Sequence, residues 1–156
     1  MRTKNERGFS LIELLIVVAI IGIVASIAVP NLLASRRAAN EGSAQQSMRT
    51  IASCEATYLF TYGGGSYTDL GGLGSKTLTD GVLASGSKSG YTFAATPVAG
   101  LSAQYWAYAA PTITSGIGQT GTRRFSISED AVLRGDATLT PPADDAEVKT
   151  MPPLGN

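Results

Sequence analysis

The side chain with the most informative chemistry in this sequence is Glu13, a single carboxylate in an otherwise uncharged stretch. Every other residue from Phe9 to Val29 is uncharged. A charged side chain deep in a membrane helix costs about 2.5–3.5 kcal/mol on insertion scales, and the dipole of a helix N-terminus offsets part of that cost. Unless its side chain reaches the water interface, such a carboxylate needs a cation as its partner.

The composition excludes several kinds of catalysis. The chain has 156 residues, of which 12 are basic and 12 acidic, with one cysteine, Cys54, and no histidine. An intrachain disulfide, a thiolate–imidazole zinc site and a histidine-based triad are therefore impossible. No serine lies in a G-x-S-x-G motif, and no Walker A phosphate-binding loop is present. We predict that the protein is not an enzyme, needs no cofactor, and packs Cys54 as a small apolar residue on a helix.

Two further groups of residues are weak candidates for binding. Asp144 and Asp145 lie in a proline-rich tail and could bind Ca²⁺, but the spacing of an EF-hand loop is absent. We therefore predict no metal site. Arg123 and Arg124 could contact a nucleic-acid backbone, but two adjacent arginines are a weak signal, and we interpret them as the solvated edge of a strand.

The stretch from Phe9 to Val29 has the length of a membrane span. Its 21 residues measure about 31 Å as a helix, which matches the hydrocarbon core of a bilayer. Arg2, Lys4 and Arg7 precede it, so the N-terminus should stay in the cytoplasm and the rest of the chain should be exported.

Two ordinary interpretations of this stretch remain open. A secretory signal peptide would have its apolar region from Leu14 to Val24 and its cleavage site after Ser26-Ile27-Ala28. A plain single-pass anchor would hold an external domain. Neither accounts for Glu13, and a signal peptide does not account for an apolar run that begins at Phe9 or for a helical pattern that resumes after Pro30.

The junction of basic leader and apolar run resembles a known family motif. The residues from 8 to 23 read Gly-Phe-Ser-Leu-Ile-Glu-Leu-Leu-Ile-Val-Val-Ala-Ile-Ile-Gly-Ile. They are similar to the cleavage and methylation motif of the type IV pilin and pseudopilin family. The resemblance implies cleavage after Gly8, N-methylation of Phe9, and pairing of Glu13 with the Phe9 amine of a neighbouring subunit. It also implies a helix that kinks or loosens between Gly22 and Pro30, where proline removes a backbone donor.

The remaining pattern predicts an α+β fold of the pilin type. A long N-terminal helix, both transmembrane and filament core, should reach Tyr62, end at Gly63-Gly64-Gly65, and pack against a small antiparallel sheet of three or four strands. The strand-like runs are Tyr91–Ala95, Gln104–Ala109, Arg124–Ser128 and Val132–Arg134. The expected divisions are a cytoplasmic leader (1–8), a transmembrane and filament-core helix (9–29), the exported half of the helix (30–62), an αβ loop (63–90), the sheet (91–139) and a flexible tail (140–156).

The resemblance implies a structural subunit of a type IV pilus-like filament. Such a subunit is a single-pass protein of the cytoplasmic membrane before assembly and part of an extracellular or periplasmic filament afterwards. Its partners would be copies of itself, a prepilin peptidase and methyltransferase, an assembly platform and a motor ATPase. The alternatives are a pseudopilin of a type II secretion system and a membrane-anchored module that binds DNA or another ligand. The absence of a Pro-Asp-Pro-Trp-Gly-like stretch weakens the secretion alternative, and Cys54 alone cannot form the C-terminal disulfide of many type IV pilins.

Overall fold

The first element among the described residues is one long helix, whose second half belongs to a mixed helix-and-sheet unit. The computed structural model describes residues 8–100 and 103–155, so residues 1–7 of the expected leader lie outside the described residues. Helix α1 (Leu11–Thr61) continues without interruption through Pro30, and its ends lie within two residues of the expected ones. The chain divides into two compact units, the first ending at Ser35 and the second beginning at Arg36.

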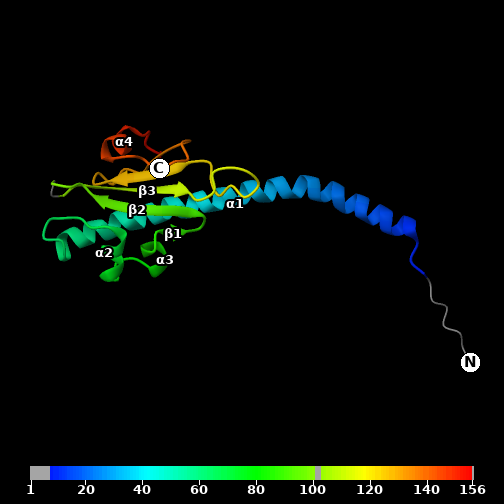
Figure 1. The fold of residues 1–156 in the computed structure, drawn as a ribbon, viewed down its shortest axis with the longest axis horizontal. Helices are drawn as coiled ribbons and strands as arrows, with labels where there is room; N and C mark the ends of the chain where they lie inside the picture. Colours follow the sequence, from blue (N-terminus) through cyan, green and yellow to red (C-terminus); the bar gives the residue numbers. More distant parts are fainter. Residues whose placement is uncertain (1–7, 101–102, 156) are drawn as a thin grey trace, which may run out of the picture. The chain divides into compact units, whose positions relative to one another are not determined.

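The second unit contains a single five-stranded antiparallel meander (Figure 1). Its strands, in spatial order, are β1 (Ser87–Lys88), β2 (Tyr91–Pro97), β3 (Tyr105–Pro111), β4 (Arg124–Ser128) and β5 (Arg134–Asp136). The expected α+β fold is confirmed, and the additional strand is the two-residue β1. A tight turn follows β4, where the Ala131 N–H donates to the Ser128 carbonyl at 2.9 Å.

The core lies between α1 and one face of the sheet. Alternate strand residues point to opposite faces, and Phe125 and Ile127 are buried with Met48 and Ile51 of α1. Strand β3 carries the aromatic residues Tyr105, Trp106 and Tyr108, of which only Tyr105 lies in this cluster. Trp106 and Tyr108 are half-buried on the opposite face, where their rings stack with centroids 5.9 Å apart.

Two short helices lie between α1 and the sheet in the sequence. Helix α2 (Leu70–Ser75) and helix α3 (Gly81–Ala84) begin at the capping side chains of Asp69 and Asp80. Leu70, Leu73 and Leu83 are buried, whereas Val82 is exposed.

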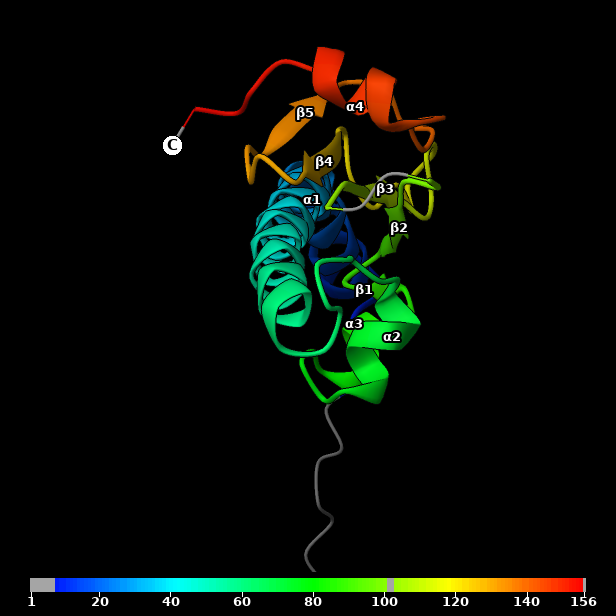
Figure 2. The ribbon, with the colours of Figure 1, turned by 90° about the vertical axis from the view of Figure 1, so that its left-hand side faces the viewer.

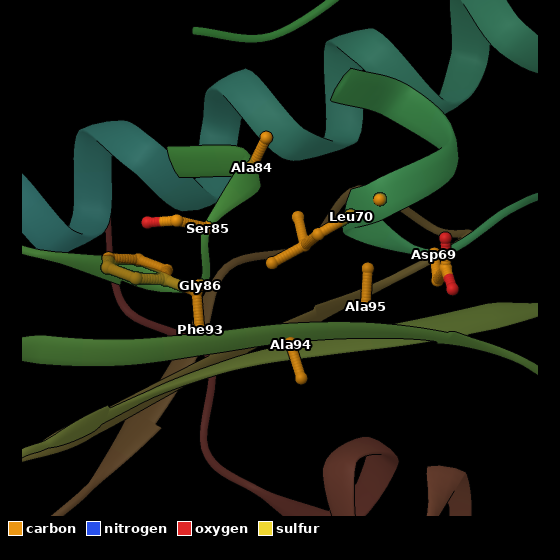
Figure 3. Close-up of a pocket in the computed structure, with 9 residues that line it drawn as sticks. Asp69, Leu70, Ala84, Ser85, Gly86, Phe93, Ala94 and Ala95 are labelled. Carbon is orange, nitrogen blue, oxygen red and sulfur yellow. The ribbon is translucent and has the colours of Figure 1, made fainter. Parts of the chain in front are cut away.

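A hollow of about 260 Å³ lies between these short helices and strand β2. Figure 3 shows Phe93 and Ala95 on the side of β2 that faces Leu70, while Ala94 points to the other side. The residues that line this hollow are apolar or small, apart from Asp69 and Ser85. Asp69 is already engaged, because its carboxylate accepts from the Gly72 N–H at 2.7 Å.

The C-terminal segment, expected to be flexible or extended, contains helix α4 (Asp145–Thr150). Figure 2 shows α4 beside β4 and β5. The Ser126 hydroxyl donates to Met151 Sδ at 3.0 Å on the sheet face opposite the core. Asp144 caps the helix by accepting from the Glu147 N–H at 2.8 Å, so the acidic residues of the tail organise a local fold.

Candidate functional site

The apolar part of α1 is uncovered in the single chain. Large apolar side chains between Phe9 and Val29 range from 48% exposed at Val17 to 81% exposed at Leu11. Within the described residues, α1 is the one helix long and apolar enough to cross a membrane. A core helix of a soluble domain would bury such a surface, so these side chains need lipid or another protein surface around them.

Glu13 forms part of a local cap at the start of this helix. Its carboxylate accepts from the Ser10 N–H at 3.0 Å, and the Glu13 and Leu14 N–H groups donate to the Ser10 carbonyl. The reach of an N3 glutamate back to the N-cap N–H is one half of a capping box. Ser-x-x-Glu in the sequence is the signal for this cap, and our sequence interpretation considered only the charge of Glu13.

The other expected site residues lie along the same segment. Gly8 and Phe9 precede α1 and are exposed, while Gly22 and Pro30 lie inside the helix. Cleavage after Gly8, methylation of Phe9 and a kink between Gly22 and Pro30 stay predictions. Glu13 lies three residues from Ser10, close in sequence to the amine that cleavage would create at Phe9.

A polar clasp centred on Glu41 joins the second unit's part of α1 to the loop before β4. Glu41 accepts from the Thr122 N–H at 2.7 Å, the Thr122 hydroxyl at 2.6 Å and the Arg123 guanidinium at 3.0 and 3.2 Å. Asn40 adds a hydrogen bond to the Thr120 carbonyl. Glu41 is buried in the folded chain, with only 7% of its surface exposed.

Hydrogen bonds hold Glu41 in its charged form. Burial by itself would raise the pKa of Glu41, but the bonds from Thr122 and Arg123 outweigh it and hold that pKa below its usual value. The clasp also engages Arg123, which the sequence had suggested as a solvated residue. Its role here is to bind a carboxylate of the same chain.

Replacing Glu41 with glutamine should destabilise the fold at neutral pH by about 1–3 kcal/mol, because a glutamine cannot accept from all the donors that face it. Because folding lowers the pKa of Glu41, its carboxylate stabilises the folded state at pH values above its unfolded pKa, near 4.5. This stabilisation is lost as the pH falls through the lower pKa that Glu41 has in the folded state. Urea unfolding followed by Trp106 fluorescence should therefore separate wild type from Glu41→Gln at pH 7, and the difference should shrink as the pH falls below 4.5. Equal urea midpoints for wild type and Glu41→Gln at pH 7 would contradict a stabilising role of the Glu41 clasp.

A second polar network, around Arg124, attaches the C-terminal segment to the sheet. Arg124 is 4% exposed and donates to Asp136 at 3.0 Å, Glu147 at 2.6 Å and the Thr140 carbonyl at 3.0 Å. Burial alone would lower the pKa of Arg124, but its bonds to Asp136 and Glu147 raise it instead. These contacts come from β5, α4 and the segment between them, where a disulfide is impossible.

The tail carboxylates are also occupied by protein groups. Lys149 Nζ lies 2.7 Å from both Glu129 Oε1 and Asp145 Oδ2. Among the described residues, no three acidic or cysteine side chains gather closely enough to hold a metal ion. The tail therefore uses Asp144 and Asp145 to cap and pair α4.

Comparison with known proteins finds one family motif and several relatives of this chain. Residues 3–29 match the family described as the prokaryotic N-terminal methylation motif. The chain is 60% identical over 38 residues to the type IV wide pilus major component PilA4 of Thermus thermophilus, covering 24% of this chain and 29% of that protein. It is 41% identical over 109 residues to the type IV major fimbrial protein FimA of Dichelobacter nodosus, covering 64% of this chain and 62% of that protein.

A second kind of relative belongs to type II secretion systems. The chain is 43% identical over 42 residues to the type II secretion system core protein G of Escherichia coli, covering 27% of this chain and 29% of that protein. The matched segments thus span between about a quarter and three fifths of these relatives' lengths. In its N-terminal motif and in its fold of a long apolar helix with an antiparallel sheet, the chain is similar to the type IV pilin and pseudopilin family.

Proposed function

We propose that this chain is the precursor of a structural subunit of a type IV pilus-like filament. The supporting observation is the uncovered apolar surface of α1 with one carboxylate near its N-terminus. In the membrane, lipid surrounds this surface; in a filament, the helices of other subunits replace the lipid. Because both surroundings are apolar, shape and polar pairing must direct the exchange.

Processing creates the second half of the proposed pair. Hydrolysis of the peptide bond between Gly8 and Phe9 would free a positively charged amine at Phe9, which a methyltransferase would then methylate. In the filament, Glu13 of one subunit would pair with the Phe9 amine of a neighbour and fix the axial register. Within a single chain, the Glu13 carboxylate accepts from the Ser10 N–H, and this bond would compete with the pairing between subunits.

The remaining partners follow from this proposal. A prepilin peptidase and methyltransferase would process the precursor, and an assembly platform with a motor ATPase would extract it from the cytoplasmic membrane. The N-terminus would face the cytoplasm because of Arg2, Lys4 and Arg7. The role is structural rather than enzymatic.

A pseudopilin of a type II secretion system is the second candidate, because two type II secretion system core protein G relatives are 47% and 43% identical to the chain over 36 and 42 residues. Both candidates predict cleavage and polymerisation, so filament images and secretion assays are needed to separate them. Long surface fibres containing this chain support the pilus. A deletion strain that loses protein secretion but keeps its fibres supports the pseudopilin.

Mass spectrometry of the mature protein tests the common first step. We expect an N-terminus at Phe9 that carries one added methyl group, because the motif places the scissile bond after Gly8. A strain without the peptidase should retain the full-length chain, which serves as the control. An N-terminus at Val29 would instead establish a secretory signal peptide and exclude the proposed function.

A further inference from the structure

A second glutamate on α1, Glu55, is buried without the partners that Glu41 has. It lies about four helical turns after Glu41, and none of its surface is exposed. Its Oε2 accepts from the Thr68 N–H at 3.2 Å, while its Oε1 has no hydrogen-bond partner among the described groups. Neither the sequence pattern nor the proposed filament assigns this carboxyl a role.

The titratable groups that interact with Glu55 come from each element around it. They are Cys54 on α1, Tyr67 in the loop after α1, Asp69 at the start of α2, and Tyr105 on β3. The rings of Tyr67 and Tyr105 lie 4.5 Å apart. These four groups are one thiol, two phenols and one carboxylic acid, so none offers a positive charge to the Glu55 carboxylate.

This surrounding favours the neutral carboxyl. Burial raises the pKa of Glu55 to about 7 and the negative charge of Asp69 adds to the rise, although the bond from Thr68 favours the charged form. Glu41 shows the opposite balance on the same helix, because four donor contacts surround its carboxylate. Glu55 therefore changes charge near neutral pH, whereas Glu41 stays ionised.

Glu55 also holds a particular segment of the chain. Thr68 lies between the end of α1 and the start of α2, and its main chain is bound to α1 through the Glu55 carboxyl. Farther along, the Cys54 thiol donates to the Leu78 carbonyl at 2.9 Å. Between these two attachments, Leu70 and Leu73 are buried in the core.

We propose that Glu55 is a proton-dependent clasp that holds residues 66–75 against α1 when its carboxyl is neutral and loosens them when it is ionised. Loss of the proton to solvent leaves a buried negative charge that has one donor and faces Asp69. Moving the segment away from α1 admits water to the carboxylate and relieves the burial. The clasp belongs to the folded single chain and does not depend on filament assembly.

The size of the effect follows from linkage. An acid whose pKa is about 7 when closed and 4.5 when open makes opening about tenfold more favourable at pH 8 than at pH 6. The sign is fixed by the raised pKa: the closed state binds the proton more tightly, so closure weakens as the pH rises from about 4.5 to about 7, and the effect levels off above that.

Hydrogen–deuterium exchange of the full chain in neutral detergent micelles tests the clasp. After correction for intrinsic rates, amides in residues 66–75 should lose about tenfold protection between pH 6 and pH 8. The Glu55→Gln variant, which keeps a neutral side chain, should show no such change. Glu41→Gln is the matched control and should keep the wild-type pH response in this segment.

Three results would overturn the proposal. The first is wild-type protection of residues 66–75 that stays constant between pH 6 and pH 8. The second is a Glu55→Gln variant that keeps the full pH response, since another group would then be responsible. The third is an equal loss of protection in β3 and β4, because that pattern indicates unfolding of the whole unit and not release of one segment.

Discussion

Cells that produce the Glu13→Gln variant should insert and process it as they do the wild-type chain, yet carry few or no filaments. Glutamine keeps the size of the side chain and can still accept from the Ser10 N–H, so the start of α1 is retained. It cannot neutralise the amine that cleavage would create at Phe9. A buried pair that loses one partner is destabilised by about 3–5 kcal/mol, equivalent to association at least about a hundredfold weaker at each contact.

Two further variants separate the charge of Glu13 from its capping role. Glu13→Val removes both, so it should assemble no better than Glu13→Gln and should lose some helicity near Ser10. Glu13→Asp keeps the charge on a shorter side chain and should recover part of the assembly. Filament counts by electron microscopy, with immunoblots for cleaved subunit, provide the measurement. Normal filaments from Glu13→Gln would show that Glu13 acts only as a cap within its own chain.

The Arg124→Met variant should lose about 3–5 kcal/mol of folding free energy. Methionine fills much of the same space but leaves Asp136 and Glu147 without the cation that binds both. The Thr140 carbonyl loses its donor as well. Because these partners lie in β5, α4 and the segment between them, the C-terminal segment should detach first. Urea unfolding of the full chain in detergent, with limited proteolysis of residues 137–155, measures both effects.

The matched control for Arg124 is an exposed ion pair of the same unit. Lys88 lies 3.1 Å from Asp80, and both side chains are substantially exposed. Such pairs contribute about 0–1 kcal/mol, so Lys88→Met should unfold close to wild type. If Arg124→Met also unfolded close to wild type, the buried network would not be what retains the C-terminal segment.

Patterns within the sequence were sufficient for much of the fold. A run of apolar residues after a basic leader, three successive glycines and alternating strands predicted the long helix, its end and most of the sheet. Such signals depend on residues that are near one another in the chain, and a helix or strand period expresses them directly. The capping role of Glu13 was equally local, since Ser10 and Glu13 are three residues apart, and Ser-x-x-Glu is its signal.

The sequence alone could not determine the roles of the buried charges. Glu41, Glu55 and Arg124 look like ordinary surface residues, and helical spacing placed Glu41 off the buried face. Glu41 meets Thr122 and Arg123, about 80 residues away, and Arg124 on β4 meets Glu147 on α4, 23 residues away. A local period cannot report such partners.

The sequence by itself determined how the N-terminal segment is organised: a basic leader, an apolar helix and one carboxylate at its start. The tertiary structure decided which acids stay charged and how the C-terminal segment is held. The physical reason is that the charge state of a buried group depends on the donors that folding brings to it. Glu41 receives several and stays ionised, while Glu55 receives one and takes up a proton near neutral pH.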